Sequence, residues 1–247
     1  MTNKSITKCR LCRRLAMSSE IVSLDFGGTL AYETKEEHIV YYDAFGKLGF
    51  KLDIDDLQLA LKHAKAWWKQ EKKQGKIWNE HMTVKYADRI LSYLKINGTM
   101  NLAKRVAELW REIAEYKAYD DVEPTILALR KEGYRLIVIS NVSSVMNLSK
   151  FLSKVNLNSY FDLLVGSGSI GIEKPNRGIF LWASNSLRVD PSQIIHVGDD
   201  YEADYLGAIE AGLKAALIDR NNANANINAT RIRSLIELPQ LIKRTWG

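Results

Sequence analysis

The chain has few cysteines and prolines and no long apolar run. Of its 247 residues, two are cysteine and four are proline, while 46% are hydrophobic. This composition argues against an intrinsically disordered chain and is typical of a soluble globular protein with a large core. No apolar stretch approaches the roughly 20 residues that a transmembrane helix needs. We therefore expect a cytoplasmic protein, and we do not expect a membrane partner.

The two cysteines, Cys9 and Cys12, form a single Cys-x-x-Cys within a basic segment. A zinc site would need further ligands, and a thioredoxin-like motif would need a strand before it and a helix after it. Residues 1–17 also lack the apolar region of a secretory signal. We interpret them as a disordered basic extension. A transit peptide and a translation start at Met17 are alternative interpretations.

Net positive charge is small outside this extension. The formal net charge is +6, but residues 1–19 contain five basic side chains and no acid, so the remainder is nearly neutral. A basic face for nucleic acid is therefore not implied. No P-loop and no glycine-rich dinucleotide fingerprint is present either. The five basic residues are Lys4, Lys8, Arg10, Arg13 and Arg14.

Residues 32–119 have a helical hydrophobic period. Thr34 and Glu37 predict a capping box for a helix that ends before Gly49. Three longer amphipathic helices are expected at residues 53–74, 79–96 and 100–118. Four such helices in succession predict an antiparallel bundle. Its tryptophans are candidates for the wall of an apolar pocket, although aromatic residues at helical spacing more often belong to a core: Trp67, Trp68, Trp78 and Trp110.

From residue 120 onward, apolar strands alternate with helices. This alternation predicts an α/β fold with a Rossmann-like, doubly wound parallel sheet. Its core domain would comprise residues 18–31 and 120–247, and residues 32–119 would form an inserted four-helix domain. The expected strands are at residues 21–24, 134–139, 161–165, 194–197 and 214–218. The expected helices between them are at residues 124–131, 145–156, 178–187 and 201–211.

Polar motifs follow several of these strands. The first strand runs directly into Asp25-Phe26-Gly27-Gly28-Thr29-Leu30, and a carboxylate there costs free energy unless a metal or a lysine pairs with it. Ligands of parallel sheets bind beyond the carboxyl ends of strands, where Asp25, Ser140 and Asp199 are expected. The further motifs are Ser140-Asn141, Lys174-Pro175, and Gly198-Asp199-Asp200 with Asp204. In this order, over roughly residues 20 to 220, the motifs resemble the haloacid dehalogenase superfamily of aspartate-nucleophile hydrolases.

The resemblance implies a Mg²⁺-dependent phosphohydrolase with a helical cap, acting on a small phosphorylated metabolite through an aspartyl-phosphate. Asp25 would be the nucleophile and a metal ligand. The Gly27 carbonyl and Asp199 would be the other protein ligands of Mg²⁺, which prefers oxygen donors. Lys174 would neutralise the charge that builds up between Asp25 and the phosphate, where two anions must meet.

The resemblance also implies roles for the remaining motif residues. Thr29, Ser140 and backbone N–H groups near Asn141 would hold phosphate oxygens. Asp204 would orient Lys174 or the outer shell of the metal, and Asp200 would support it. Read from the residues alone, Asp200 also fits an N-cap for the helix that follows.

Gly27 departs from the pattern of the family's phosphatases. They carry at this position a second Asp, which protonates the leaving alcohol and then activates water. General acid–base assistance is worth about 10²–10⁴-fold, so its loss predicts slow turnover of alkyl phosphates. One explanation is an acid/base from elsewhere, with Glu33 and His38 nearest in sequence. Another is a substrate whose leaving group needs little protonation.

Three further alternatives remain for the function. The chain would be a weakly active or inactive member that binds a phosphorylated ligand or a protein partner. It would cleave phosphonates through a Schiff base on a lysine of the cap, for which Lys62, Lys65 and Lys69 are candidates. Dehalogenation of a haloacid is least favoured, because Asp199 and Asp204 keep the site acidic.

Overall fold

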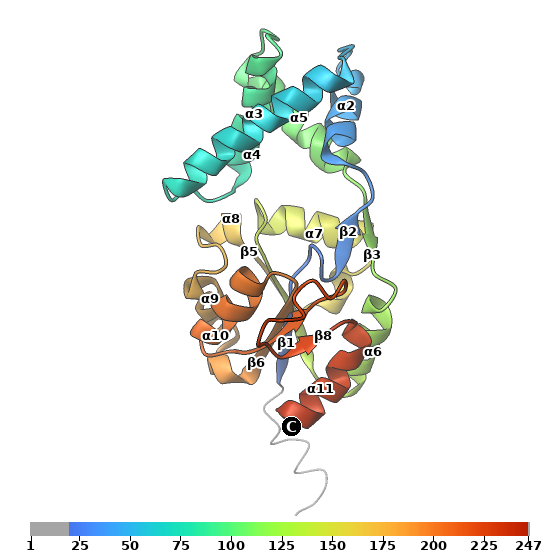
Figure 1. Cartoon of the computed structure of the whole chain (residues 1–247), viewed down its shortest axis with the longest axis vertical. Coiled ribbons are helices and arrows are strands. Elements are labelled where there is room, and N and C mark those ends of the chain that lie inside the picture. The colour runs from blue at the N-terminus through green and yellow to red at the C-terminus, as the bar shows by residue number, and fades with distance from the viewer. Residues whose placement is uncertain (1–19, 247) are drawn as a thin grey trace, which may run out of the picture.

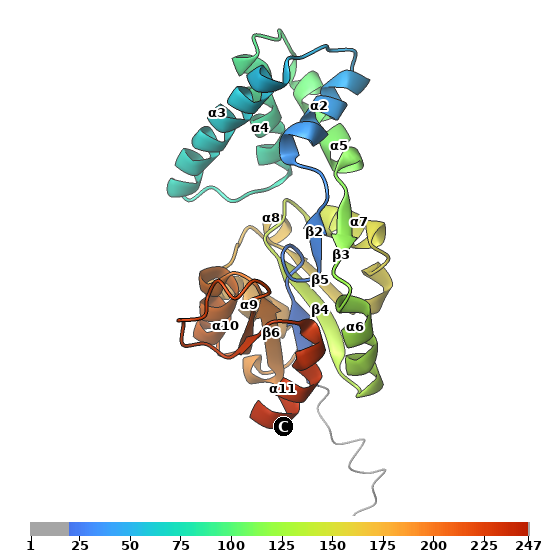
Figure 2. The same ribbon diagram turned by 45° about the vertical axis from the view of Figure 1, so that its right-hand side comes forward.

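The computed structural model describes residues 20–246, which form a sheet-based core and a separate helical unit above it (Figures 1 and 2). The predicted extension, with Cys9 and Cys12, lies outside the described residues. Within residues 20–246, no helix is both long enough and apolar enough to cross a membrane.

The core contains a six-stranded parallel sheet in the order β5-β4-β1-β6-β7-β8. The first four strands of this order are almost entirely apolar, as expected for a parallel sheet that is covered on both faces. The predicted doubly wound α/β fold is therefore confirmed. The strands are β1 (Ile21–Leu24), β4 (Arg135–Ser140), β5 (Leu163–Gly166), β6 (Ile194–Gly198), β7 (Lys214–Ile218) and β8 (Arg231–Ile232).

Alternate residues of β1, β4, β5, β6 and β7 enter two different hydrophobic clusters. Val22 and Leu24 pack with α6 (Val122–Lys131), α7 (Val145–Lys154) and α11 (Leu238–Thr245). Ile21, on the opposite face, packs with α9 (Arg177–Leu187) and α10 (Gly207–Glu210). Figure 1 shows α9 and α10 on one side of the sheet and α6 and α11 on the other. The shorter helical segments are η1 (Asn158–Tyr160), α8 (Ser167–Ile170), η2 (Pro191–Gln193), the π-helix η3 (Tyr201–Leu206) and η4 (Leu235–Glu237).

The helical unit has a hydrophobic core of its own. Two of its helices begin where the sequence predicts, because Asp53 and Asn79 accept hydrogen bonds from backbone N–H groups of the first turn. Side chains from all four helices meet in the core, including Phe45, Leu57, Ile90 and Val106. The helices are α2 (Glu37–Lys47), α3 (Ile54–Lys73), α4 (Glu80–Tyr93) and α5 (Met100–Ile113).

Two short strands, β2 (Ala31–Glu33) and β3 (Tyr116–Ala118), connect the helical unit to the core and pair antiparallel. The predictions were wrong here: the last helix of the unit ends at Ile113, not at residue 118, and Thr34 does not cap the first helix. Thr34 instead continues the pairing, its N–H donating to the Glu115 carbonyl at 3.1 Å. Tyr116 is held in the strand by aromatic packing against Phe26 and Phe151.

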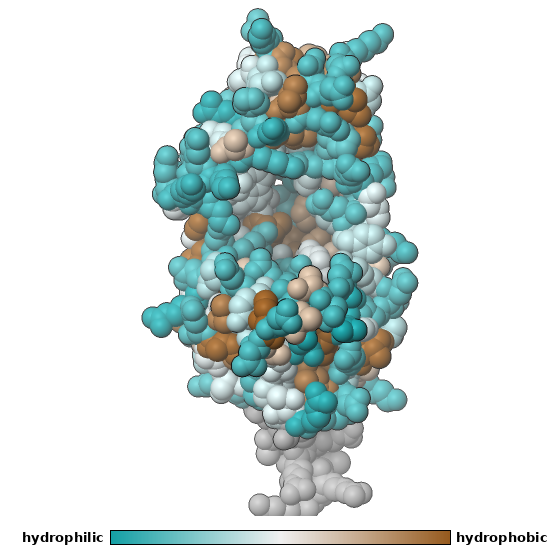
Figure 3. All heavy atoms as spheres, viewed as in Figure 1, coloured by the Kyte–Doolittle hydropathy of each residue, from teal (hydrophilic) through white to brown (hydrophobic). Residues whose placement is uncertain are grey.

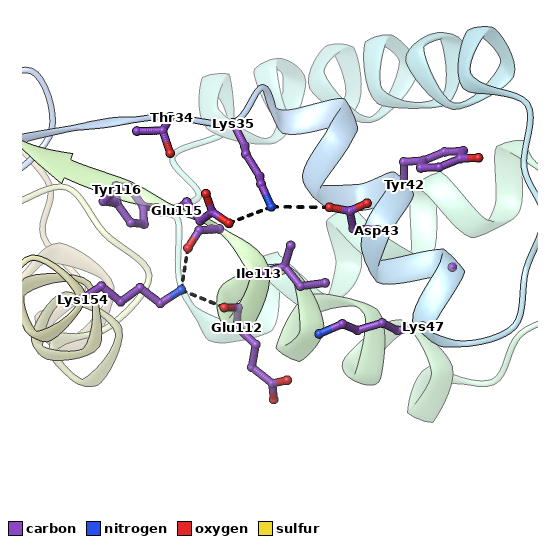
Figure 4. Close-up of a pocket in the computed structure, with 12 residues that line it drawn as sticks. Thr34, Lys35, Tyr42, Asp43, Lys47, Glu112, Ile113, Glu115, Tyr116 and Lys154 are labelled. Atoms are coloured by element: carbon purple, nitrogen blue, oxygen red, sulfur yellow. Dashed lines mark hydrogen bonds and ion pairs between the residues drawn. The ribbon is translucent and has the colours of Figure 1, made fainter.

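Lys154, on α7 of the core, bridges to the helical unit at this connection. Its Nζ donates to the carbonyl oxygens of Arg111 at 2.8 Å, Glu112 at 2.9 Å and Ala114 at 2.5 Å. These are carbonyls at the end of α5, which have no partner within the helix. Figure 4 shows the Lys154 side chain reaching this end of α5. The lysine thereby satisfies the helix terminus and complements its partial negative charge.

We expect Lys154→Met to lower the free energy of unfolding by about 1–2 kcal/mol, because it removes charged hydrogen bonds to a helix end. Urea unfolding at neutral pH measures the change. Lys150→Met is the matched control, because Lys150 lies on the same helix with an exposed side chain. An equal loss of stability in both variants would contradict the bridge.

Candidate active site

The site forms where β1 lies between β4 and β6. Leu24 is in register with Val138 of β4 and Val197 of β6, and the Asp25 N–H donates to the Val197 carbonyl at 2.9 Å. The chain order of the strands reverses at β1, which is where open α/β sheets bind their ligands. Asp25 therefore leaves the sheet at the mouth of this crevice.

Lys174 reaches Asp25 from the loop before α9. Its Nζ donates to Asp25 Oδ1 at 2.7 Å, to Asp204 Oδ1 at 2.6 Å and to the Ile139 carbonyl at 3.0 Å. An ammonium carries three protons, so all of its donors are used. The structure thus brings together three of the predicted site residues, Asp25, Lys174 and Asp204.

Burial and charge pairing act in opposite directions on these groups. Burial raises the pKa of Asp25, against the attraction of Lys174. Burial alone would disfavour the Lys174 ammonium, but Asp25 and Asp204 outweigh it and raise the pKa of Lys174. The same attraction overcomes the desolvation of Asp204 and lowers its pKa. The Lys174–Asp204 pair is therefore fully charged at neutral pH.

The imidazole of His196 contacts the Asp204 carboxylate. Its Nε2 lies 3.2 Å from Asp204 Oδ1, and its Nδ1 lies 2.9 Å from the Ser23 hydroxyl. Burial lowers the pKa of His196, so the neutral imidazole is favoured. No role was predicted for this residue from the sequence, although a histidine within the apolar strand β6 is the signal that could have found it.

Asp199 follows β6 and faces the turn after β1. Gly28 has φ of +70°, and a Cβ on it would collide with the Asp199 carboxylate, so only glycine fits there. Thr29 Oγ1 donates to Asp199 Oδ1 at 3.4 Å. Desolvation, with repulsion from Asp25 and Asp204, raises the pKa of Asp199 to about 6.

Carboxylate oxygens of Asp25, Asp199 and Asp204 lie within 4.8 Å of one another. Among residues 20–246, Lys174 pairs with Asp25 and Asp204, and no lysine or arginine forms an ion pair with Asp199. The cluster therefore has more negative than positive charge. Oxygen donors with excess negative charge fit a hard divalent cation such as Mg²⁺.

Among residues 20–246, the space where a side chain at Gly27 would begin is open. A Cβ built on Gly27 has no atom within 4 Å outside its chain neighbours. Glu33 is on β2 and lines the cavity between the helical unit and the core, whereas His38 lies beside a separate surface pocket with Glu36 and Lys62. Desolvation and repulsion from Glu37 raise the pKa of Glu33.

The other predicted residues have the following contacts. The Asn141 amide is bonded to the backbone of Lys174, donating to its carbonyl at 2.9 Å and accepting from its N–H at 2.8 Å. Ser140 is buried at the end of β4 and favours the charged form of Asp25. Asp200 caps η3 by accepting from the N–H groups of Glu202 and Ala203.

The cavity between the helical unit and the core has a volume of about 640 Å³. Figure 3 shows a hollow there, with pale and brown surfaces behind a largely teal rim. Trp68, Trp78 and Trp110 line it, but Trp67 does not and instead packs beneath the Arg89 guanidinium. Of the candidate lysines, Lys65 lines the cavity but is paired with Glu37 at 2.6 Å, and Lys69 is exposed on α3.

Arg220 supports the Gly28–Thr29 turn from outside the predicted site. It donates to the Thr29 carbonyl at 2.8 Å, binds both oxygens of Asp121, and lies 3.7 Å from the centre of the Tyr119 ring. Asp121 also accepts from the Ser234 hydroxyl and the Leu235 N–H. Arg220 follows β7 at the carboxyl edge of the sheet, and that position is the signal by which it could have been found.

The fold and the site define a class: a doubly wound α/β protein with a helical insertion and an acidic site at the switch point. The profile of the haloacid dehalogenase-like hydrolases matches residues 20–212. The chain belongs to this family.

Two curated relatives are phosphatases by name. A glyceraldehyde 3-phosphate phosphatase of Methanopyrus kandleri is 35% identical over 44% of this chain and 46% of its own length. The human N-acylneuraminate-9-phosphatase is 31% identical over 58% of this chain and 59% of its own. The chain thus spans about half the length of the curated relatives it matches.

Solved structures share the fold over nearly the whole chain. A 2-haloacid dehalogenase from Pseudomonas syringae has a TM-score of 0.69 at 21% identity, covering 92% of this chain and 99% of its own. A HAD phosphatase from Thermococcus onnurineus has a TM-score of 0.60 at 23% identity, covering 90% and 97%. At these identities the likeness establishes the fold alone.

We expect Asp121→Asn to lower the free energy of unfolding by about 1–3 kcal/mol at pH 7, since the amide cannot replace the carboxylate in its bonds to Arg220, Ser234 and Leu235. These bonds outweigh desolvation and lower the pKa of Asp121. Their contribution is therefore complete above the unfolded-state pKa of about 4 and is lost as the pH falls below it.

Urea unfolding of both proteins between pH 7 and pH 3.5 tests this expectation. The difference between them should shrink as the pH falls. Asp120→Asn is the control, because the neighbouring side chain is 97% exposed. A difference that stays constant with pH, or that Asp120→Asn reproduces, would count against the Asp121 network.

Proposed function

We propose that the chain is a Mg²⁺-dependent phosphohydrolase that acts on a small phosphorylated metabolite in the cytoplasm. The observation that carries the proposal is the arrangement of Asp25, which is bound to Lys174 at 2.7 Å and lies beside the Asp199 carboxylate. The names of the two phosphatase relatives support the same reaction class.

A magnesium ion fits this acidic cluster. Asp25, Asp199 and the Gly27 carbonyl would hold it, and when bound it would supply the charge that neutralises phosphate oxygens. Asp204 is committed to Lys174, His196 and the Asp200 N–H, so its role is to position the lysine.

The side chains of the site provide the remaining functions. Asp25 would attack phosphorus and form an aspartyl-phosphate, which water then hydrolyses. Lys174 would keep the attacking carboxylate charged and oriented. Thr29, Ser140 and backbone N–H groups next to Asn141 would hold the phosphate oxygens, with the Asn141 amide fixing the lysine loop.

We propose that the helical unit is a cap over this site. The Glu80 carboxylate, at the start of α4, accepts from Ser144 at 2.6 Å and from Asn147 at 2.8 Å, both on the core. Lys72 of α3 pairs with Glu173, next to Lys174, at 3.0 Å. These contacts hold the helical unit over the cavity.

A second candidate is a protein that binds a phosphorylated ligand without consuming it. The open space at Gly27 favours it, because within residues 20–246 nothing lies where the side chain of an acid at this position would begin. Stable binding of a phosphate ester without release of phosphate would distinguish this candidate from the enzyme.

We expect Asp25→Asn to abolish Mg²⁺-dependent phosphate release, a loss on the order of 10³-fold or more, because the amide is not a nucleophile. A colorimetric phosphate assay with acetyl phosphate, with and without EDTA, measures it.

The control for the charge change is Asp120→Asn, for which we expect the native rate. Acetyl phosphate provides a good leaving group, so the test does not depend on an acid at Gly27. Equal phosphate release by the native and Asp25→Asn proteins would contradict the proposal that the chain is an enzyme.

A further inference from the structure

The cavity over the site has an aromatic wall, defined here as Trp68, Trp78, Tyr86, Tyr41 and Trp110. All five line the cavity, and they form one continuous chain of ring contacts. The centroid distances along it are 4.9 Å, 5.5 Å, 6.3 Å and 6.2 Å. Asn141 and Glu173 line the cavity on the side of the core and are the chain neighbours of Ser140 and Lys174, which places the cavity beside the site.

The cations of the cavity are already paired. Lys65 lies 2.6 Å from Glu37, Lys72 lies 3.0 Å from Glu173, and Arg111 lies 3.2 Å from Glu80. A second anionic group on the ligand would have to break one of these pairs and would also face the carboxylate of Glu33. The cavity therefore fits a ligand part that is uncharged and has a flat apolar face.

Within residues 20–246, no carboxylic acid stands at the position two residues after Asp25, from which a leaving group would receive a proton. The position of an acid at Gly27 is open space, with no atom within 4 Å of a Cβ built there. Lys174 uses its three protons on Asp25, Asp204 and Ile139. A departing oxygen must therefore leave as an anion, which only a weakly basic oxygen does readily.

We propose, building on the phosphohydrolase function above, that the substrate is a phosphate monoester of a planar, uncharged, acidic hydroxyl compound: an aryl or enol phosphate. An Asp25 oxygen forms the new bond to phosphorus while the bond to the aryl or enol oxygen breaks. The electron pair departs with that oxygen, which takes its proton from bulk water. A second water then attacks phosphorus, giving inorganic phosphate and restoring the Asp25 carboxylate.

Matched substrates test the leaving group. Phenyl and benzyl phosphate carry the same ring and charge, but the benzyl alcohol is a far weaker acid than phenol. For the native protein we expect kcat/KM to be at least about 10²-fold higher for phenyl phosphate. The structure has room for an aspartate side chain at Gly27. Gly27→Asp should therefore raise kcat/KM for benzyl phosphate and reduce the difference between the two esters. Equal kcat/KM of the native protein for phenyl and benzyl phosphate would overturn the proposal. Hydrolysis of benzyl phosphate that is lost in Glu33→Gln would also overturn it, because Glu33 would then be the acid.

Variants of the aromatic wall test the planar group. Trp78→Ala and Trp68→Ala should raise KM for phenyl phosphate about two- to tenfold, the value of one ring contact. Acetyl phosphate has a good leaving group and no ring, so its KM should not change. Trp67→Ala is the control, because this ring lies next to Trp68 but outside the cavity lining.

Two further comparisons keep the outcomes distinct. Trp78→Leu retains apolar volume in case the alanine variant unfolds, and it should give the same KM change. Equal effects of the Trp67 and Trp78 variants, or equal effects on acetyl and phenyl phosphate, would refute the aromatic subsite. If the native protein does not hydrolyse acetyl phosphate, the phosphohydrolase function itself fails. If it does so but does not prefer aryl esters, only the substrate class fails.

Discussion

The site depends on the three hydrogen bonds of the Lys174 ammonium. They join Asp25 to Asp204 and to the Ile139 carbonyl in a region where Lys174 is only 3% exposed. Buried carboxylates are costly unless paired, so the lysine favours the charged form of both aspartates. The partners come from different strands and loops, and they meet only when β1, β4 and β6 lie side by side. Fold and charge pairing therefore depend on each other.

Much of the fold can be predicted from local patterns, and the exceptions have a physical cause. The strands of the sheet are apolar because both faces are covered, and Asp53 and Asn79 mark helix starts through caps made within one turn. The strands β2 and β3 cannot be predicted in this way, because three residues are too few to show an alternation of apolar and polar side chains. Their pairing joins Ala31 to Ala118, far apart in the sequence, and Tyr116 is placed by Phe26 and Phe151.

The site residues that can be predicted from the sequence are those that directly follow strands of the sheet. Asp25, Ser140 and Asp199 follow parallel strands whose carboxyl ends share one edge, so their proximity follows from the topology. His196 and Arg220 act through other groups: the histidine contacts Asp204, and the arginine contacts the Thr29 carbonyl. Such contacts depend on which groups the fold brings together, so the sequence marks these two residues only by position: His196 lies within an apolar strand and Arg220 follows β7.

The two glycines after Phe26 are constrained in different ways, and the difference bears on the chemistry. Gly28 is required by geometry, since its φ is +70° and a Cβ would strike the Asp199 carboxylate. Gly27 has no such constraint, because a side chain there would enter open space. Packing therefore does not explain the missing carboxyl group at Gly27. The proposed substrate class is consistent with this absence, since a carboxyl group at Gly27 would serve a strongly basic leaving group and is dispensable for a weakly basic one.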